Sequence, residues 1–352
     1  DYDKNKDYKG KVLIARAGSV NDQSPNSLYG MARTKRDLAI KAGAVAFIEF
    51  HTFDNAYWHN VTRYLGHESF GIADQDKPSV DMPHIWVKSK LPDNKQVDIK
   101  LKVEGISRSI VTSSNVVGMV EGTDPELKDE FIIYSAHYDH VGVGAPNAEG
   151  DSIYNGARDN AVGTVTVLSA AENIAKYPTK RSALFILFTA EEKGLLGSQY
   201  YVEHPLLPLD QMVYCFNSDN ASYNDTSKAT IVGLNRTTAE DHIKEAAQAF
   251  GLTAINDPAP EQNLFDRSDN VHFAKKGIPA PTFSLGFTAF DAEVFKYYHQ
   301  PSDNPDNVDY DYLTKFFRAY VLSCRNIANA EQTPFWVEGD KYFEAGKALY
   351  QK

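Results

Sequence analysis

Cysteine is nearly absent from this chain: Cys215 and Cys324 are the only two among 352 residues. A cysteine-rich metal site is therefore excluded. Cys215 lies in an apolar run and Cys324 in a predicted helix, which favours two buried free thiols over a disulfide. The cysteine count leaves the cellular compartment open.

Long apolar runs and an excess of positive charge are also missing. No run approaches the ~18 apolar residues that are typical of a membrane-spanning helix. The net charge is −11, from 36 basic and 47 acidic residues, which argues against nucleic acid or an anionic membrane surface as the main partner. The hydrophobic content of 42% is ordinary for a globular protein. Nothing in the composition indicates an oligomeric state.

The sequence begins at Asp1 without an initiator methionine or a signal peptide. We expect a processed or trimmed product whose export signal, if it had one, preceded Asp1. A chain of 352 residues exceeds the usual size of one compact core, so we expect one large and one smaller domain.

The pattern of the sequence changes near residue 112. Before it, short strands are predicted at 10–16, 44–50, 85–87 and 97–103, with a helix at 31–42, and no cluster of metal-ligating side chains is found. After it, strands alternate with helices, which predicts an α/β fold with a mostly parallel central sheet flanked by helices. The predicted strands are 116–120, 131–135, 183–188, 212–216, 229–232 and 281–285, and the helices are 160–176, 238–250 and 312–328. We therefore divide the chain into residues 1–112 and 113–352.

The predicted helix at 160–176 has an apolar repeat at three- and four-residue spacing. The residues in this repeat are Ala161, Val165, Leu168, Ala171 and Ala175. We expect this face to pack on the sheet. A further amphipathic helix is predicted at 341–350, without assigned chemistry.

Polar side chains follow three of the predicted strands. His137 and Asp139 follow 131–135, the pair Glu191 and Glu192 follows 183–188, and Asp219 follows 212–216. Because ligands gather at the carboxyl ends of parallel strands, we expect these side chains to meet there. Two adjacent carboxylates point in different directions, so one can bind a metal while the other transfers a proton.

Two further residues complete the candidate set. Asp159 precedes a predicted helix, where it is either an N-cap worth about 1 kcal/mol or a metal ligand. His299 comes last along the chain, and its imidazole is a metal ligand of borderline hardness. In the His137-x-Asp139 pair, Asp139 can accept the second ring N–H of a metal-bound imidazole. Together these residues indicate the site of a two-metal hydrolase.

Five segments of this region resemble the signature blocks of a co-catalytic di-zinc exopeptidase family. They are Ser135-Ala-His-Tyr-Asp-His140, Asn155-Gly-Ala-Arg-Asp-Asn160, Phe188-Thr-Ala-Glu-Glu-Lys-Gly-Leu-Leu-Gly197, Asn217-Ser-Asp219 and Tyr298-His-Gln-Pro-Ser-Asp303. The family includes secreted bacterial leucyl aminopeptidases, glutamate carboxypeptidase II and the catalytically inactive transferrin receptor. The first third resembles a protease-associated domain, in Lys9-Gly-Lys-Val-Leu-Ile14 and Ala39-Ile-Lys-Ala-Gly-Ala44.

The resemblance implies a zinc exopeptidase fold and two Zn²⁺ ions. It implies that His137 and Asp219 hold one ion, that Glu192 and His299 hold the other, and that Asp159 bridges them. Glu191 would be the general base that takes a proton from the water between the metals. Tyr298 would donate a hydrogen bond to the developing oxyanion, or would only pack beside the site. The implied function is an aminopeptidase that acts on peptides outside the cytoplasm, secreted or periplasmic.

Rival interpretations stay open on the residues themselves. A carboxypeptidase or dipeptidase of the same fold would need a cationic cluster for the substrate carboxylate, to which Arg158 and Arg267 could belong. A non-catalytic receptor-like module would have lost its ligands, which are all present here. Two features depart from the family pattern: its usual first helix and strand are missing, and Arg267-Ser-Asp-Asn270 stands where relatives often have Ser-Asp-His.

Overall fold

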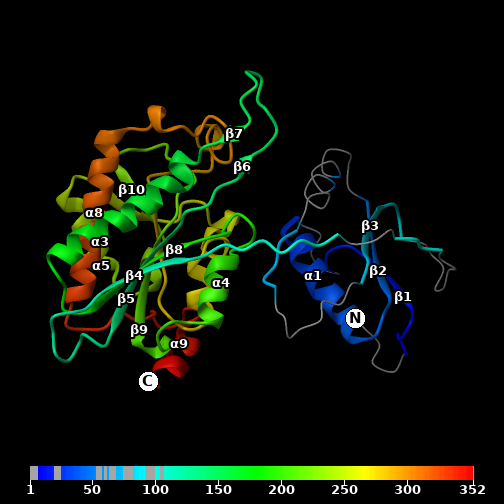
Figure 1. The fold of residues 1–352 in the computed structure, drawn as a ribbon, viewed down its shortest axis with the longest axis horizontal. Coiled ribbons are helices and arrows are strands. Elements are labelled where there is room, and N and C mark those ends of the chain that lie inside the picture. Colours follow the sequence, from blue (N-terminus) through cyan, green and yellow to red (C-terminus); the bar gives the residue numbers. More distant parts are fainter. Residues whose placement is uncertain are drawn as a thin grey trace. The chain divides into compact units, whose positions relative to one another are not determined.

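The computed structural model describes residues 7–19, 25–52, 58, 62, 69–73, 82–91, 100–103 and 107–351. The chain divides into two compact units. One consists of Asp1–Ser69 and Ala73–Val111, and the other of Phe70–Ile72 and Thr112–Lys352. All of the candidate site residues belong to the second, larger unit (Figure 1).

The smaller unit contains a parallel sheet of three strands in the order β1-β2-β3. Its elements are β1 (Val12–Arg16), α1 (Pro25–Lys41), β2 (Ala46–His51) and β3 (His84–Lys88). These elements confirm the strands predicted at 10–16, 44–50 and 85–87 and the helix at 31–42. The predicted strand at 97–103 lies partly outside the described residues, and residues 100–103 form no strand.

A buried carboxylate lies inside this smaller unit. Glu49 is fully buried, and its two oxygens lie 2.8 Å from the Lys35 ammonium and 2.9 Å from His84 Nε2. Ion pairs of this kind satisfy a buried charge. The Glu49 carboxylate thus holds His84 inside this unit.

The larger unit is built on a seven-stranded sheet in the order β11-β10-β12-β9-β5-β8-β4. Its strands are β4 (Val116–Val120), β5 (Phe131–His137), β8 (Ser182–Phe188), β9 (Met212–Ser218), β10 (Lys228–Val232), β11 (Thr253–Asn256) and β12 (Thr282–Leu285). A short hairpin of β6 (Gly142–Val143) and β7 (Ile153–Tyr154) stands apart from it. Strands β5, β8 and β9 are parallel neighbours, whereas β4 pairs antiparallel with β8 and β10 with β12. The sheet is therefore mixed, with its parallel centre as predicted.

The central strands are apolar because helices cover both of their faces. Along β5, Ile132 and Tyr134 belong to one core, and Phe131 and Ile133 to the other. Helices α3 (Gly163–Lys176), α5 (Glu240–Ala249) and α8 (Tyr310–Asn329) cover the first face, while α4 (Leu196–Glu203), α6 (Asn270–Lys275) and α9 (Phe343–Tyr350) cover the second (Figure 1). Among the described residues, no helix has the length and apolar content to cross a membrane.

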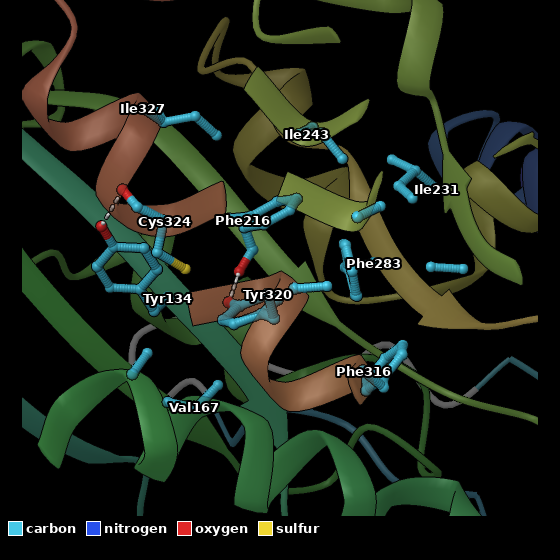
Figure 2. Close-up of a cluster of buried hydrophobic side chains, with 14 of the residues drawn as sticks. Tyr134, Val167, Phe216, Ile231, Ile243, Phe283, Phe316, Tyr320, Cys324 and Ile327 are labelled. Atoms are coloured by element: carbon cyan, nitrogen blue, oxygen red, sulfur yellow. Dashed lines mark hydrogen bonds between the residues drawn. The ribbon is translucent and has the colours of Figure 1, made fainter. Parts of the chain in front are cut away.

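Aromatic side chains dominate the first core (Figure 2). The Tyr320 ring stacks on Phe216 with a centroid distance of 4.7 Å, and its hydroxyl donates to the Phe216 carbonyl over 2.6 Å. Cys324 belongs to this core, whereas Cys215 belongs to the core on the opposite face. Both thiols are buried and free, which confirms the prediction.

The buried face of α3 differs from the predicted one. Val165 and Leu168 of the predicted apolar face are 43% and 53% exposed. The buried residues are instead Gly163, Thr166, Val167, Ala170 and Ile174. The prediction of this face was therefore wrong, and a neighbouring face of α3 packs on the sheet.

Candidate metal centre and active site

The site lies at the carboxyl ends of three neighbouring parallel strands in the sheet. His137 is the last residue of β5, Asp219 directly follows β9, and Glu191 and Glu192 lie three and four residues beyond the end of β8. Because β8, β5 and β9 are consecutive and parallel in the sheet, their carboxyl ends meet. The fold thus brings these side chains together as predicted.

Two loops supply the remaining candidates. Asp159 belongs to the turn Ala157–Val162 that leads into α3. Its main-chain N–H donates to the Asp303 carboxylate over 3.2 Å, which fixes the turn. His299 follows α7 (Ala292–Phe295) and has a φ of 52°. This left-handed conformation is uncommon outside glycine and is typical of functional sites.

The five candidate ligands form one connected set. His137 Nε2 lies 3.2 Å from Asp219 Oδ1 and 3.4 Å from Asp159 Oδ1. His299 Nε2 lies 3.1 Å from Asp159 Oδ2 and 3.1 Å from Glu192 Oε2. The two oxygens of Asp159 therefore face two different histidines, which is the arrangement of a bridging carboxylate.

These distances suit zinc. Zinc–ligand bonds of roughly 2.0–2.1 Å in a tetrahedron place the ligand atoms roughly 3.3 Å apart, and the four contacts above span 3.1–3.4 Å. Imidazole nitrogen and carboxylate oxygen are also ligand types that zinc accepts. The donor set thus fits zinc, the metal that the family resemblance implies.

The electrostatics of the site fit a cation as well. Burial would lower the pKa of His137, but the carboxylates of Asp219 and Asp159 outweigh it and hold the pKa well above its usual value. Burial would also lower the pKa of His299, but its contacts with Asp159 and Glu192 outweigh burial and raise this pKa to about 10. Buried carboxylates therefore concentrate negative charge here, which a metal ion would neutralise.

Glu191 lies beside the first of these histidines. Its carboxylate is within 4.8 Å of the donor atoms of His137 and Asp219. Burial raises the pKa of Glu191 well above its usual value, and a raised pKa favours uptake of a proton near neutral pH. Geometry and pKa together suit a proton acceptor.

Asp139 supports this loop in a way that differs from the prediction. Its carboxylate accepts the main-chain N–H of Glu191 over 3.0 Å and that of Glu192 over 3.2 Å. Its Oδ1 is 3.9 Å from His137 Nδ1, which lies closer, at 3.0 Å, to the main-chain carbonyl of Asp139. The carbonyl, rather than the carboxylate, therefore orients the His137 ring.

Tyr298 adjoins the second histidine. Its ring stacks on His299 with a centroid distance of 4.1 Å. Arg267 Nη2 donates to its hydroxyl oxygen over 3.2 Å, so the hydroxyl proton is free to point elsewhere. Burial raises the pKa of Tyr298, which keeps the phenol protonated and able to donate a hydrogen bond.

Residue patterns did not identify three neighbours of the site. His140 Nδ1 lies 3.0 Å from Glu192 Oε1, and Asp269 is fully buried with its pKa raised to about 7 by burial. Asp303, fully buried, pairs with Arg158 over 3.0 Å. His140 and Asp303 lie inside the quoted signature segments, but nothing in their residue type shows which group they contact.

The pairing of Arg158 changes its interpretation. Its side chain is 2% exposed, and besides Asp303 it contacts Asn307 and the Tyr297 ring, 3.7 Å from the ring centroid. Both terminal nitrogens of the guanidinium are thus engaged inside the protein. Arg158 is not available for a substrate carboxylate, contrary to the expectation for a carboxypeptidase.

Comparisons with known proteins show which family the chain resembles. Residues 115–322 match the model of peptidase family M28. Aminopeptidase YwaD of Bacillus subtilis is 28% identical, over 87% of this chain and 60% of that protein. A probable leucine aminopeptidase 2 of Aspergillus oryzae is 32% identical, over 92% of this chain and 64% of that protein. The chain spans less than two thirds of the length of either relative.

Two solved structures have a similar fold and are named as aminopeptidases. The aminopeptidase from Aneurinibacillus sp. strain AM-1 has a TM-score of 0.54 at 19% identity, and covers 94% of this chain and 72% of its own. The zinc aminopeptidase BSAP of Bacillus subtilis has a TM-score of 0.51 at 22% identity, with 93% and 72% covered. These likenesses support the α/β fold. Because the family model covers more than half of the chain, the protein belongs to peptidase family M28.

Proposed function

We propose that this protein is a zinc-dependent aminopeptidase that hydrolyses N-terminal residues of peptides. The observation that carries the proposal is the bridging position of Asp159, with one oxygen toward His137 and the other toward His299. Relatives named as aminopeptidases support the choice of substrate end. Two bound zinc ions would polarise the scissile carbonyl and acidify a water molecule.

The side chains divide the remaining work. His137 and Asp219 would hold one zinc, Glu192 and His299 the other, and Asp159 both. Glu191 would accept the proton of the attacking water and pass it to the leaving amine. Asp139 would fix the Glu191–Glu192 loop through its two N–H contacts, and Tyr298 would donate its hydroxyl proton to the oxyanion.

We also infer that residues 1–112 form a protease-associated-like domain and residues 113–352 the catalytic domain. The division of the contacts near residue 112 supports this boundary, although Phe70–Ile72 group with the larger unit. A secreted or periplasmic location stays a prediction from the family resemblance.

The alternative exopeptidases have less support. A carboxypeptidase needs a cationic group for the substrate carboxylate, but Arg158 is buried against Asp303, and of the two predicted cations only Arg267 stays accessible. A receptor-like module without catalysis would not need Glu191 beside a complete ligand set. We therefore favour the aminopeptidase.

The decisive test combines substrates with one substitution. Aminoacyl chromogenic amides and their N-acetylated counterparts are offered to the protein before and after chelation and zinc restoration. We expect cleavage of the free amines alone, lost with the chelator and regained with zinc. Glu191→Gln should retain zinc yet lose about 10²–10⁴-fold in turnover, whereas Glu172→Gln, at an exposed position of α3, should not change it. Full activity of Glu191→Gln would remove Glu191 from this role.

A further inference from the structure

His140 is a buried histidine at the site that the proposed zinc ligands leave unused. It follows Asp139 in the loop after β5, and its side chain is 9% exposed. Its ring meets the His299 ring edge-on, with centroids 5.7 Å apart. His140 therefore lies against the metal position that Glu192 and His299 would form.

The Glu192 carboxylate is divided between the two histidines. Oε2 faces His299 Nε2 at 3.1 Å, while Oε1 lies 3.0 Å from His140 Nδ1. The approach to His140 is short but is not aligned as a hydrogen bond, so both ring nitrogens and Oε1 are buried without a hydrogen-bond partner among the described residues. Buried polar atoms left in this state indicate a site that is completed when its ligand binds.

The turn at Gly156 passes close to the His140 ring. Gly156 has a φ of 65°, and a Cβ at this position would lie 2.6 Å from His140 Cγ and 2.4 Å from the Asp159 carbonyl. Only glycine permits such a close approach. The turn that carries Asp159 is thus packed directly on the His140 ring.

We infer that His140 is a positioning residue for the zinc held by Glu192 and His299. A small rotation of the ring on zinc binding would align Nδ1–H with Glu192 Oε1, 3.0 Å away, and leave Oε2 for the metal, so that the carboxylate would bind through one oxygen. His140 Nδ1 faces Oε1, whereas His299 faces Oε2, which places His140 beside the carboxylate. Because His140, Asp159 and Glu192 also offer donor atoms within 4.8 Å of one another, direct ligation by His140 is the competing arrangement. This inference rests on the proposed function.

A measurement of zinc affinity tests the inference independently of enzyme activity. The metal-free full chain is titrated with zinc against a chelating dye as wild type, His140→Ala and His140→Asn. The control is His204→Ala, an exposed histidine at the end of α4 whose Nδ1 contacts only the Tyr200 carbonyl. We expect His140→Ala to weaken one of two zinc sites about 10–100-fold, His140→Asn to restore part of the loss through its amide donor, and the control to match wild type.

The outcomes separate the inference from the proposed function. Two wild-type zinc sites and unchanged affinities in both His140 variants would overturn the inference alone. X-ray absorption of zinc-loaded His140→Ala that shows one nitrogen ligand fewer than wild type would also overturn it, because His140 would then be a ligand. A weakened site in a protein that cleaves no peptide would support the inference and refute the aminopeptidase. A wild type that binds no zinc would overturn both.

Discussion

Asp303 offers a sharp test of how the turn bearing Asp159 is held. Its Oδ1 accepts from Arg158 Nη1 over 3.0 Å, and its Oδ2 accepts the main-chain N–H groups of Arg158 and Asp159 over 2.9 and 3.2 Å. Every contact requires an acceptor. Asp303→Asn keeps the shape but replaces one acceptor with an N–H₂ group, and it leaves the buried Arg158 charge uncompensated.

The expected loss follows from this geometry. Removing one partner of a buried ion pair destabilises by about 3–5 kcal/mol. The Arg158 guanidinium keeps its contacts with Asn307 at 2.7 Å and with the Tyr297 ring at 3.7 Å, so we take the lower end, about 3 kcal/mol. In a domain of this size that loss lowers the melting temperature by about 6–12 °C.

Thermal unfolding of the metal-free protein measures the change without a contribution from bound zinc. The matched control is Asp306→Asn, an exposed aspartate three residues along the same loop, which should shift the free energy by less than about 0.5 kcal/mol. Arg158→Met in the Asp303→Asn background should recover part of the loss because no buried charge remains. Equal melting temperatures for Asp303→Asn and Asp306→Asn would refute the reasoning.

Two further predictions concern protons and close packing. The pKa of His299 is raised to about 10 in the metal-free site, so the ring is protonated at neutral pH and zinc must displace that proton. Zinc affinity should therefore rise as the pH increases toward 10 and fall as the pH decreases. Calorimetric titrations in buffers of different ionisation heat that detect no proton release would contradict this. Gly163→Ala should destabilise by about 1–3 kcal/mol, since its Cβ would lie 2.3 Å from Asn160 Oδ1. Gly118→Ala, where a Cβ meets nothing within 4 Å, should melt within a few degrees of wild type.

The central strands and the ends at which the site lies could be predicted from the sequence, whereas β11 and the short β6–β7 hairpin were missed. Buried strands such as β5 and β8 are apolar throughout and end at polar residues, so their positions and their functional ends are both readable. The direction of a strand relative to its neighbours cannot be predicted in this way. An apolar run looks the same whether its neighbour is parallel or antiparallel, which is why β4 and β12 appear only in the structure as antiparallel partners of β8 and β10.

The supporting residues could not be predicted because their partners depend on how loops meet. Asp303 lies 144 residues from Asp159, whose N–H it accepts, and no local pattern connects them. Asp139 was predicted to orient the His137 ring, yet its carboxylate caps the Glu191–Glu192 loop instead. Sequence identified the residue types of the site, whereas the assignment of each carboxylate to a partner required three-dimensional structure.

The rotation of α3 shows how contacts of the site select one of two apolar faces. Apolar content alone does not decide between the face of Val165 and Leu168 and the buried face of Val167 and Ile174. Instead the Asn160 amide donates to the Ser218 carbonyl over 2.9 Å and the Thr164 hydroxyl to the His137 carbonyl over 3.1 Å. Both contacts bind the first turn of the helix region to the strand ends that carry His137 and Asp219. The helix behind that turn keeps its orientation, which buries Val167 and Ile174 and exposes Val165 and Leu168.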